Sequence, residues 1–188
     1  MLLQLEPYQQ QWKTEFEELQ QFLRTILRDF NVTIEHVGCT AVEGMLAKPI
    51  LDIDIIPQDE TLLTALSTQL EKAGYLSKGE QGVPGRFAFK QIENTVPTHP
   101  LARVWMRHHL YVCLPQSIAL KNHLLFRNAL RQNPLLVQNY NQLKINLLNE
   151  PGMTKEAYSK GKTEFVLSVL ADEGVTDEEL AAIQKANE

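Results

Sequence analysis

Cysteine is scarce in this sequence of 188 residues, which limits the disulfide, zinc-binding and redox chemistry available to the chain. Cys39 and Cys113 are its two cysteines, and they lack the Cys-x-x-Cys spacing of zinc knuckles and redox motifs. Free thiols are the usual state of cysteine in a reducing compartment. The sequence therefore predicts neither a disulfide framework nor a zinc knuckle, and it favours a cytoplasmic protein.

Long apolar runs and the common glycine-rich nucleotide motifs are also missing. No apolar stretch approaches the roughly 20 residues that span a bilayer, and the opening MLLQLEPYQQ lacks the basic segment of a secretory leader. Neither the phosphate-binding pattern Gly-x-x-x-x-Gly-Lys-Ser/Thr nor the dinucleotide pattern Gly-x-Gly-x-x-Gly occurs. These absences argue against a membrane protein, a P-loop kinase and a dehydrogenase.

Acidic residues are absent from one long stretch of the chain. No Asp or Glu lies between Asn94 and Asn149, a stretch that contains Arg103, Arg107, Lys121, Arg127, Arg131 and Lys144. The net charge is nevertheless −5, which argues against a nucleic-acid surface, because phosphate backbones bind Lys and Arg. Two interpretations remain open: a positive region that binds a nucleotide or another anionic small molecule, or ordinary solvated helix faces.

The spacing of apolar residues predicts a mixture of helices and strands. Helices are expected at about 9–29, 59–73, 117–132, 134–148 and 154–170, with a last short helix from 176, and strands at 32–37, 49–56, 86–92 and 102–114. A glycine-rich turn covers 78–85. We therefore expect an α+β fold in a single domain over 1–188. A small mixed β-sheet backed by helices would occupy about 1–115, and a helical C-terminal half about 116–188.

The segment GCTAVEGMLAKPILDID, from Gly38 to Asp54, carries the main candidate site. Asp52 and Asp54 are two residues apart on a predicted strand, so both carboxylates face one side while Ile53 enters the core. Repulsion between two close carboxylates is relieved by a proton or by a hard cation such as Mg²⁺ or Mn²⁺. The alternative is an ordinary strand with one solvated face. The glycine turn and Lys48 favour the metal site.

His109 is the third candidate for this site. If its strand lies beside Asp52 and Asp54, the imidazole can act as a metal ligand or as a general base. An imidazole ligand would make Zn, Fe or Ni alternatives to Mg or Mn. A partly buried histidine with a structural role is the other interpretation. His108 is expected to point to the opposite side of the strand, and His123, on a helix, to be solvated.

Several segments of the chain resemble the GrpB (UPF0157) family in order and spacing. They are IEHVGCTAVEGMLAKPILDIDI at 34–55, GVPGRFAFK at 82–90, HHLYVC at 108–113, FRNALRQNP at 126–134, YNQLK at 140–144 and YSKGKTEFV at 158–166. The resemblance covers nearly the whole chain from 7 to 170 and implies the nucleotidyltransferase fold. It also implies that Gly38 and Cys39 approach the phosphates of a nucleoside triphosphate, while Asp52 and Asp54 bind divalent ions.

Two departures from the pattern bear on activity. Cys39 stands where active members of the superfamily carry Ser or Gly, and a thiol is a poor hydrogen-bond donor to phosphate. The predicted strand at 102–114 also lacks the Asp or Glu that would complete a set of three carboxylates. The loss of that carboxylate favours binding without catalysis, whereas the retained Asp-x-Asp pair favours an enzyme.

Three functional hypotheses follow. The first is a metal-dependent nucleotidyltransferase-fold protein that binds a nucleoside triphosphate through its Asp-x-Asp site. The second is a noncatalytic regulatory or accessory module that binds a nucleotide or another anion, and the third is a metal-dependent phosphoesterase. The metal-binding and catalytic candidates are Asp52, Asp54 and His109, and the substrate-binding candidates are Gly38, Cys39, Lys48 and Arg86. We expect no nucleic-acid or membrane partner.

Overall fold

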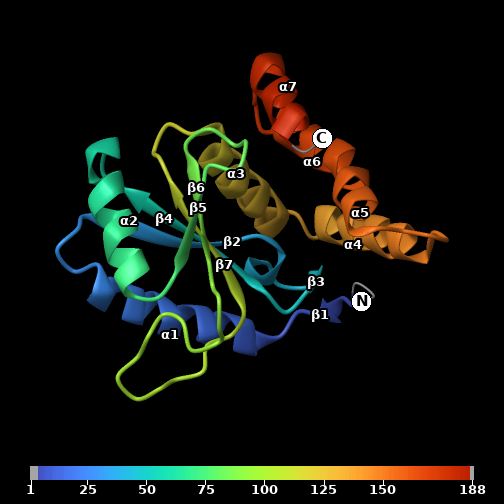
Figure 1. Cartoon of the computed structure of the whole chain (residues 1–188). Helices are drawn as coiled ribbons and strands as arrows, with labels where there is room; N and C mark the ends of the chain where they lie inside the picture. The colour runs from blue at the N-terminus through green and yellow to red at the C-terminus, as the bar shows by residue number, and fades with distance from the viewer. Residues whose placement is uncertain (1–3, 187–188) are drawn as a thin grey trace.

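A five-stranded mixed sheet forms the centre of the computed structural model, which describes residues 4–186 (Figure 1). Its strands are β2 (Val32–Val37), β4 (Leu51–Pro57), β5 (Leu76–Gly79), β6 (Arg86–Lys90) and β7 (His108–Cys113). The spatial order is β2-β4-β7-β6-β5, with β4 parallel to β7 and every other neighbouring pair antiparallel. A separate antiparallel pair joins β1 (Glu6–Pro7) to β3 (Leu46–Ala47).

Helices cover both faces of the sheet and continue beyond it. The helices are α1 (Gln10–Ile26), α2 (Leu63–Lys72), α3 (Ile118–Gln132), α4 (Pro134–Asn149), α5 (Lys155–Gly161), α6 (Thr163–Asp172) and α7 (Asp177–Ala186), and the 3₁₀ turns are η1 (Cys39–Ala41) and η2 (Glu60–Leu62). Helices α4 to α7 lie together at one side of the molecule, away from α1 and α2 (Figure 1). Within residues 4–186, no helix is long and apolar enough to cross a membrane.

The two faces of the sheet differ in polarity because side chains alternate along each strand. One face is apolar: Ile34, Ile53 and Leu110 are buried there with side chains of α1 and α2, including Leu23 and Leu66. The opposite face carries polar and charged residues, namely Glu35, Asp52, Asp54, His109, Tyr111 and Arg86. Helix α3 contacts this polar face, so charged side chains of the sheet lie close to the helical half of the chain.

The predicted α+β architecture is confirmed, whereas the extent of the strand expected at 102–114 is wrong. The strand begins only at His108. Ala102 has a φ of +50°, which a strand residue does not adopt, and the backbone N–H of Trp105 donates to Asn94 rather than to the sheet. The indole Nε1 of Trp105 donates to the carbonyl of Pro97 at 2.8 Å. This segment therefore folds back on itself before it enters the sheet.

Two further boundaries differ from the prediction. The helix expected at 154–170 is divided into α5 and α6, with the break at Gly161 and Lys162. A Cβ atom on Gly161 would lie 2.5 Å from Leu147, so the absence of a side chain there lets α5 approach α4 closely. The edge strand β5 was not predicted, because its four residues lack an alternating apolar pattern and end at a bulge near Gly79.

Candidate functional site

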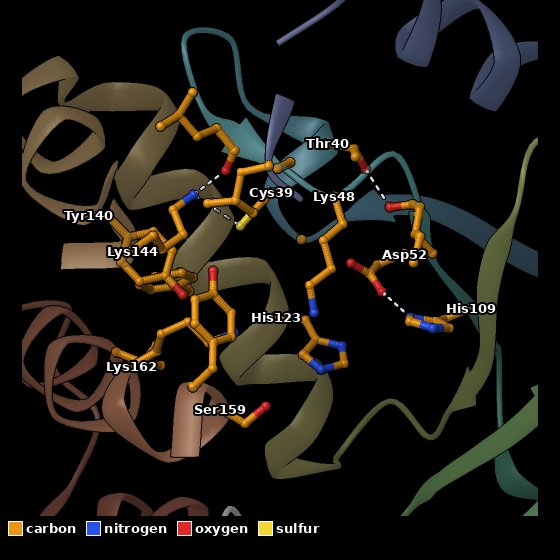
Figure 2. Close-up of a pocket in the computed structure, with 18 of the residues that line it drawn as sticks. Cys39, Thr40, Lys48, Asp52, His109, His123, Tyr140, Lys144, Ser159 and Lys162 are labelled. Atoms are coloured by element: carbon orange, nitrogen blue, oxygen red, sulfur yellow. Dashed lines mark hydrogen bonds and ion pairs between the residues drawn. The ribbon is translucent and has the colours of Figure 1, made fainter. Parts of the chain in front are cut away.

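A cavity of about 390 Å³ lies between the polar face of the sheet and the helical half of the chain. The sheet contributes Asp52 and His109 to its wall, and Lys48 comes from the segment that leads into β4. Helices α4 to α6 contribute Tyr140, Lys144, Tyr158, Ser159, Lys162, Thr163 and Val166. Figure 2 shows Asp52 and His109 on one side of the cavity, Tyr140, Lys144 and Lys162 on the other, and Lys48 between them.

The sheet holds Asp52 and His109 side by side. The two residues are register partners on the parallel strands β4 and β7. Nδ1 of His109 lies 2.9 Å from Oδ1 of Asp52, and the two side chains are about half and one third exposed. An ionised carboxylate only accepts hydrogen bonds, so the contact assigns a proton to Nδ1, and in the neutral imidazole Nε2 then keeps its lone pair.

A glycine brings the backbone directly against the carboxylate of Asp52. Gly38 has a φ of +70°, and a Cβ atom built on it would lie 2.3 Å from Oδ2 of Asp52. No other residue type fits here without moving the carboxylate, and the left-handed conformation favours glycine as well. The turn η1 follows at once and carries Cys39 and Thr40 into the cavity wall.

A buried histidine supports this turn from the other face of the sheet. Nε2 of His36 lies 2.9 Å from Oγ1 of Thr40, and that hydroxyl donates to the carbonyl of Ile50 at 3.4 Å. The imidazole stacks on Phe16 of α1. Burial lowers the pKa of His36 to about 4, so the ring is neutral at physiological pH. His36 therefore has a structural role beside the site.

The helical half of the chain fixes the loop between Gly38 and β4. Nε of Arg131 donates to the carbonyl of Ala41 at 2.9 Å. Asn141 accepts from the N–H of Leu46 at 2.8 Å and donates to the carbonyl of Gly44 at 2.9 Å. The ammonium of Lys144 also donates to the carbonyl of Leu46. The loop that forms one wall of the cavity is thus bonded to α3 and α4.

Three lysines that are far apart in the sequence lie close to two tyrosine rings in the cavity. Nζ of Lys48 lies 5.3 Å and Nζ of Lys162 lies 4.7 Å from the ring centre of Tyr158. Nζ of Lys144 lies 4.8 Å from the ring centre of Tyr140. Burial lowers the pKa of Lys48, and the positive charge of Lys162 lowers it further. These amines repel one another, and a bound anion would relieve that repulsion.

The pKa of Lys144 is also lowered by burial, with the Cys39 thiol close by. Its side chain is almost fully buried, and Nζ lies 3.9 Å from Sγ of Cys39. The thiol of Cys39 therefore contacts the ammonium group of Lys144 at the wall of the cavity. The substrate-binding role of Cys39 stays a prediction, as do the roles of Gly38 and Lys48.

Asp54 does not line this cavity. Its side chain is fully buried, and its Oδ2 lies 2.8 Å from Nδ1 of His123 on α3. Both carboxylates lie on one face of the sheet, as expected, but Asp52 alone of the two lines the cavity, while Asp54 is enclosed beneath α3. The expectation that His123 is solvated is wrong, because its side chain is 22% exposed and hydrogen-bonded to a buried carboxylate.

Arg86 lies apart from the other predicted phosphate ligands. Its guanidinium carbon is 4.8 Å from the ring centre of Tyr111. Arg86 lines a second cavity of about 650 Å³, whose wall also contains Val83 and Ile183. His123 lines both cavities. The structure thus brings Gly38, Cys39, Lys48, Asp52 and His109 to one cavity, while Arg86 faces another.

Sequence reasoning did not assign Lys144, Tyr158 and Lys162 to the same site as Asp52. Lys144 belongs to the stretch without acidic residues, and that charge asymmetry was the available signal. Tyr158 and Lys162 belong to the segment YSKGKTEFV, which carried the family resemblance without suggesting a role.

The donor set beside Gly38 fits a small divalent cation. Asp52 offers a carboxylate that is partly open to the cavity, and the absence of a Cβ at Gly38 lets this carboxylate pack against the glycine turn. His109 adds an imidazole from the neighbouring strand. Mg²⁺ usually takes one or two protein carboxylates and completes its shell with water and phosphate oxygens. Mn²⁺ tolerates the imidazole better.

Comparisons with known sequences find similarity over most of the chain. The family profile described as GrpB protein matches residues 3–172. UPF0157 protein YqkA of Bacillus subtilis is 29% identical over 159 residues, covering 85% of this chain and 43% of that protein. Glutamate-rich protein GrpB of Alkalihalophilus pseudofirmus is 29% identical over 167 residues, covering 87% of this chain and 91% of that protein. The chain thus spans less than half of YqkA.

Solved structures show the same fold. A crystal structure of conserved protein GrpB from Enterococcus faecalis has a TM-score of 0.71 and 29% identity, covering 98% of this chain and 100% of that chain. The Cid1 poly(U) polymerase with MgGTP bound has a TM-score of 0.52 and 14% identity, covering 75% of this chain and 43% of that chain. At 14% identity the likeness to Cid1 shows the fold alone. The fold is therefore nucleotidyltransferase-like.

Proposed function

The chain belongs to the GrpB family, and from the contents of its cavity we propose that it binds a nucleoside triphosphate together with a divalent cation. One observation carries the proposal: Asp52 lies in the same cavity as Lys48, Lys144 and Lys162. A carboxylate facing clustered amines suits a polyanion and its counter-ion, because each charge of the ligand meets an opposite charge.

The phosphates are assigned to the lysine wall. Lys48 and Lys162 hold their ammonium groups over Tyr158, so their positions are set before a ligand arrives. A hydrogen bond to a charged group contributes about 1.5–3 kcal/mol, which is about ten- to hundredfold in affinity. Lys144 donates a hydrogen bond to the carbonyl of Leu46 and adds a third positive charge to this wall. The likeness to Cid1, whose solved forms include one with MgGTP, supports a triphosphate as the ligand.

The cation is assigned to Asp52 and His109. A divalent ion here would neutralise phosphate charge and orient the triphosphate against the glycine turn. Asp52 and His109 offer oxygen and nitrogen ligands from adjacent strands, and the Asp52 side chain is about one third exposed. Asp54 is bonded to His123 beneath the cavity, so this assignment does not require it as a ligand.

Phosphoester hydrolysis is the second candidate function, and the bond between Asp52 and His109 favours it. The carboxylate fixes the proton on Nδ1 of His109, which leaves Nε2 free to accept a proton from water. Nucleotidyl transfer would use the same cavity but would need an acceptor hydroxyl in place of the water.

Isothermal titration with ATP, GTP, CTP and UTP, each with Mg²⁺, with Mn²⁺ or without metal, tests the proposal. We expect metal-dependent binding of at least one triphosphate. Lys162→Gln should weaken binding about tenfold or more, whereas the matched control Lys160→Gln, an exposed lysine two residues earlier, should not. No binding in any combination, or equal losses in the two lysine variants, would contradict the assignment. Release of inorganic phosphate or pyrophosphate from a bound nucleotide would favour hydrolysis.

A further inference from the structure

Beneath Asp52, three side chains that commonly bind transition metals meet between the sheet and α3. They are Asp54 of β4, Cys113 of β7 and His123 of α3. One potential ligand atom from each lies within 4.8 Å of the other two. Asp54 and Cys113 are completely buried, and His123 is partly buried. A carboxylate, a thiol and an imidazole at this separation form an incomplete coordination shell.

An unpaired oxygen at the centre of this cluster indicates that something is needed there. Oδ2 of Asp54 is paired with His123, but among the described residues the buried Oδ1 has no hydrogen bond of good geometry, and the adjacent Cys113 thiol is only a weak donor. An unpaired polar atom at zero exposure costs free energy, and a carboxylate costs more than a neutral group. A cation bound between Asp54 and Cys113 would supply the missing partner.

We propose that Asp54, Cys113 and His123 bind a borderline-soft divalent metal ion of the Zn²⁺ class. Thiolate and imidazole ligands select such ions over Mg²⁺, which prefers oxygen. Cys113 binds as the thiolate, and its proton passes to solvent when the ion enters. The two negative ligands then balance the charge of the ion.

His123 provides the route to this site. Its side chain lines both the cavity beside Asp52 and the second cavity, whereas Asp54 and Cys113 line neither, so His123 is the ligand that an entering ion would meet first. A water molecule from one of these cavities would take the fourth ligand position. The nearby guanidinium of Arg86 opposes a bound cation. Burial raises the pKa of the Cys113 thiol well above its ordinary value, and the carboxylate of Asp54 raises it further, so the thiolate forms only as the ion binds.

The proposal does not depend on nucleotide binding, because none of its ligands lies in the assigned cation set of Asp52 and His109. This separation allows the two ideas to fail independently. It also predicts that Zn²⁺ and Mg²⁺ compete poorly with each other, since each would occupy its own ligands.

The test uses the full chain, stripped with a chelator and titrated with Co²⁺ and Zn²⁺. We expect about one tightly bound ion per chain and, with Co²⁺, a sulfur-to-cobalt charge-transfer band. Cys113→Ser should abolish the band, and the matched control Cys39→Ser should keep it. His123→Gln and Asp54→Asn should each weaken Zn²⁺ binding at least tenfold, whereas Asp52→Asn should leave it unchanged.

The unmodified chain alone can overturn the proposal. Absence of a sulfur-to-cobalt band in the stripped protein would do so whether or not the variants fold. A band that is lost in Cys39→Ser but kept in Cys113→Ser would place the metal elsewhere and would be equally decisive. Thermal unfolding with and without Zn²⁺ gives an independent readout, because an ion that binds only the folded chain raises the midpoint.

Discussion

Nδ1 of His109 lies 2.9 Å from Oδ1 of Asp52, although 57 residues separate the two in sequence. The parallel pairing of β4 with β7 creates this relationship, since it makes the two residues register partners. Both side chains keep substantial exposure, so changes at either one test ligand binding with little effect on folding.

His109→Gln should reduce the affinity for Mn²⁺ with nucleotide by about tenfold, because it removes an imidazole ligand while keeping a polar side chain of similar reach. The free energy of unfolding should change by less than about 0.5 kcal/mol, as is usual at exposed positions. Titration calorimetry and urea denaturation measure the two effects. His99→Gln, at a histidine that packs against Trp105 away from the cavity, is the control. Equal affinities for the two variants would remove His109 from the site.

Gly38→Ala should destabilise the protein and disturb the site. The new Cβ would lie 2.3 Å from Oδ2 of Asp52, so the carboxylate must move. Gly44→Ala is a control for positive φ, because Gly44 has a φ of +77° while its nearest neighbour is 3.7 Å away. Each variant should lose about 1–3 kcal/mol because an alanine is strained at a positive φ. Only Gly38→Ala should lose more than that, together with the affinity for metal and nucleotide.

If Gly44→Ala proved as harmful to ligand binding as Gly38→Ala, the close approach to Asp52 would not be the cause. Circular dichroism at matched concentrations shows whether each variant is folded before its affinity is compared.

Stability should fall between pH 6.5 and pH 4 because of two buried histidines. Burial lowers the pKa of both His36 and His108 to about 4, whereas in the unfolded chain each has its ordinary pKa of about 6.5. In this interval the unfolded chain binds more protons than the folded one, so stability is fully present above pH 6.5 and declines as the pH falls. Each histidine should account for a loss of about 2 kcal/mol at pH 5.

Urea denaturation at pH 7 and pH 5 measures this loss directly. His36→Gln and His108→Gln should each reduce the difference between the two pH values, whatever their effect on stability at pH 7. A difference that is the same in both variants as in the unmodified chain would show that other groups, such as carboxylates, control the acid sensitivity.

Arg127→Met should lower the free energy of unfolding by about 2–4 kcal/mol, because Glu35 and the carbonyl of His36 would lose their buried donor. Arg127 of α3 donates to Glu35 at 2.6 Å and to the carbonyl of His36 at 2.8 Å, and its side chain is only 9% exposed. Arg28→Met is the control: Arg28 and Asp29 are about 80% exposed and 3.9 Å apart, and such pairs contribute less than about 1 kcal/mol. Similar losses in the two variants would contradict a role for Arg127 in joining α3 to β2.

Local patterns were enough to predict most of the fold. The strand Val32–Val37 follows from its residue types and the glycine after it, and α3 begins after Ser117, whose hydroxyl accepts from the N–H of Leu120. The start of α4 follows from Pro134. These signals lie within a few residues of the structure that they specify, which is why they can be recognised in a single sequence.

The cavity could be predicted only on its sheet side. Gly38, Lys48 and Asp52 are close in sequence, so their spacing marks them as a group. Lys162 reaches the same cavity from more than 100 residues away, and helical periodicity shows only which face of a helix is buried, not what it faces. His123 was misjudged for the same reason, because its partner on β4 cannot be identified from the pattern of α3.

The loop from Gly38 to Lys48 is bonded to residues that follow it by 90 to 105 positions, namely Arg131, Asn141 and Lys144. During synthesis, α1 and β2 to β4 leave the ribosome well before these partners exist. Contacts of such long sequence separation form late, since the intervening chain must close first. We therefore expect the nascent chain to form its first strands while the wall of the cavity is still unformed, and to become competent for binding only when α4 has been made.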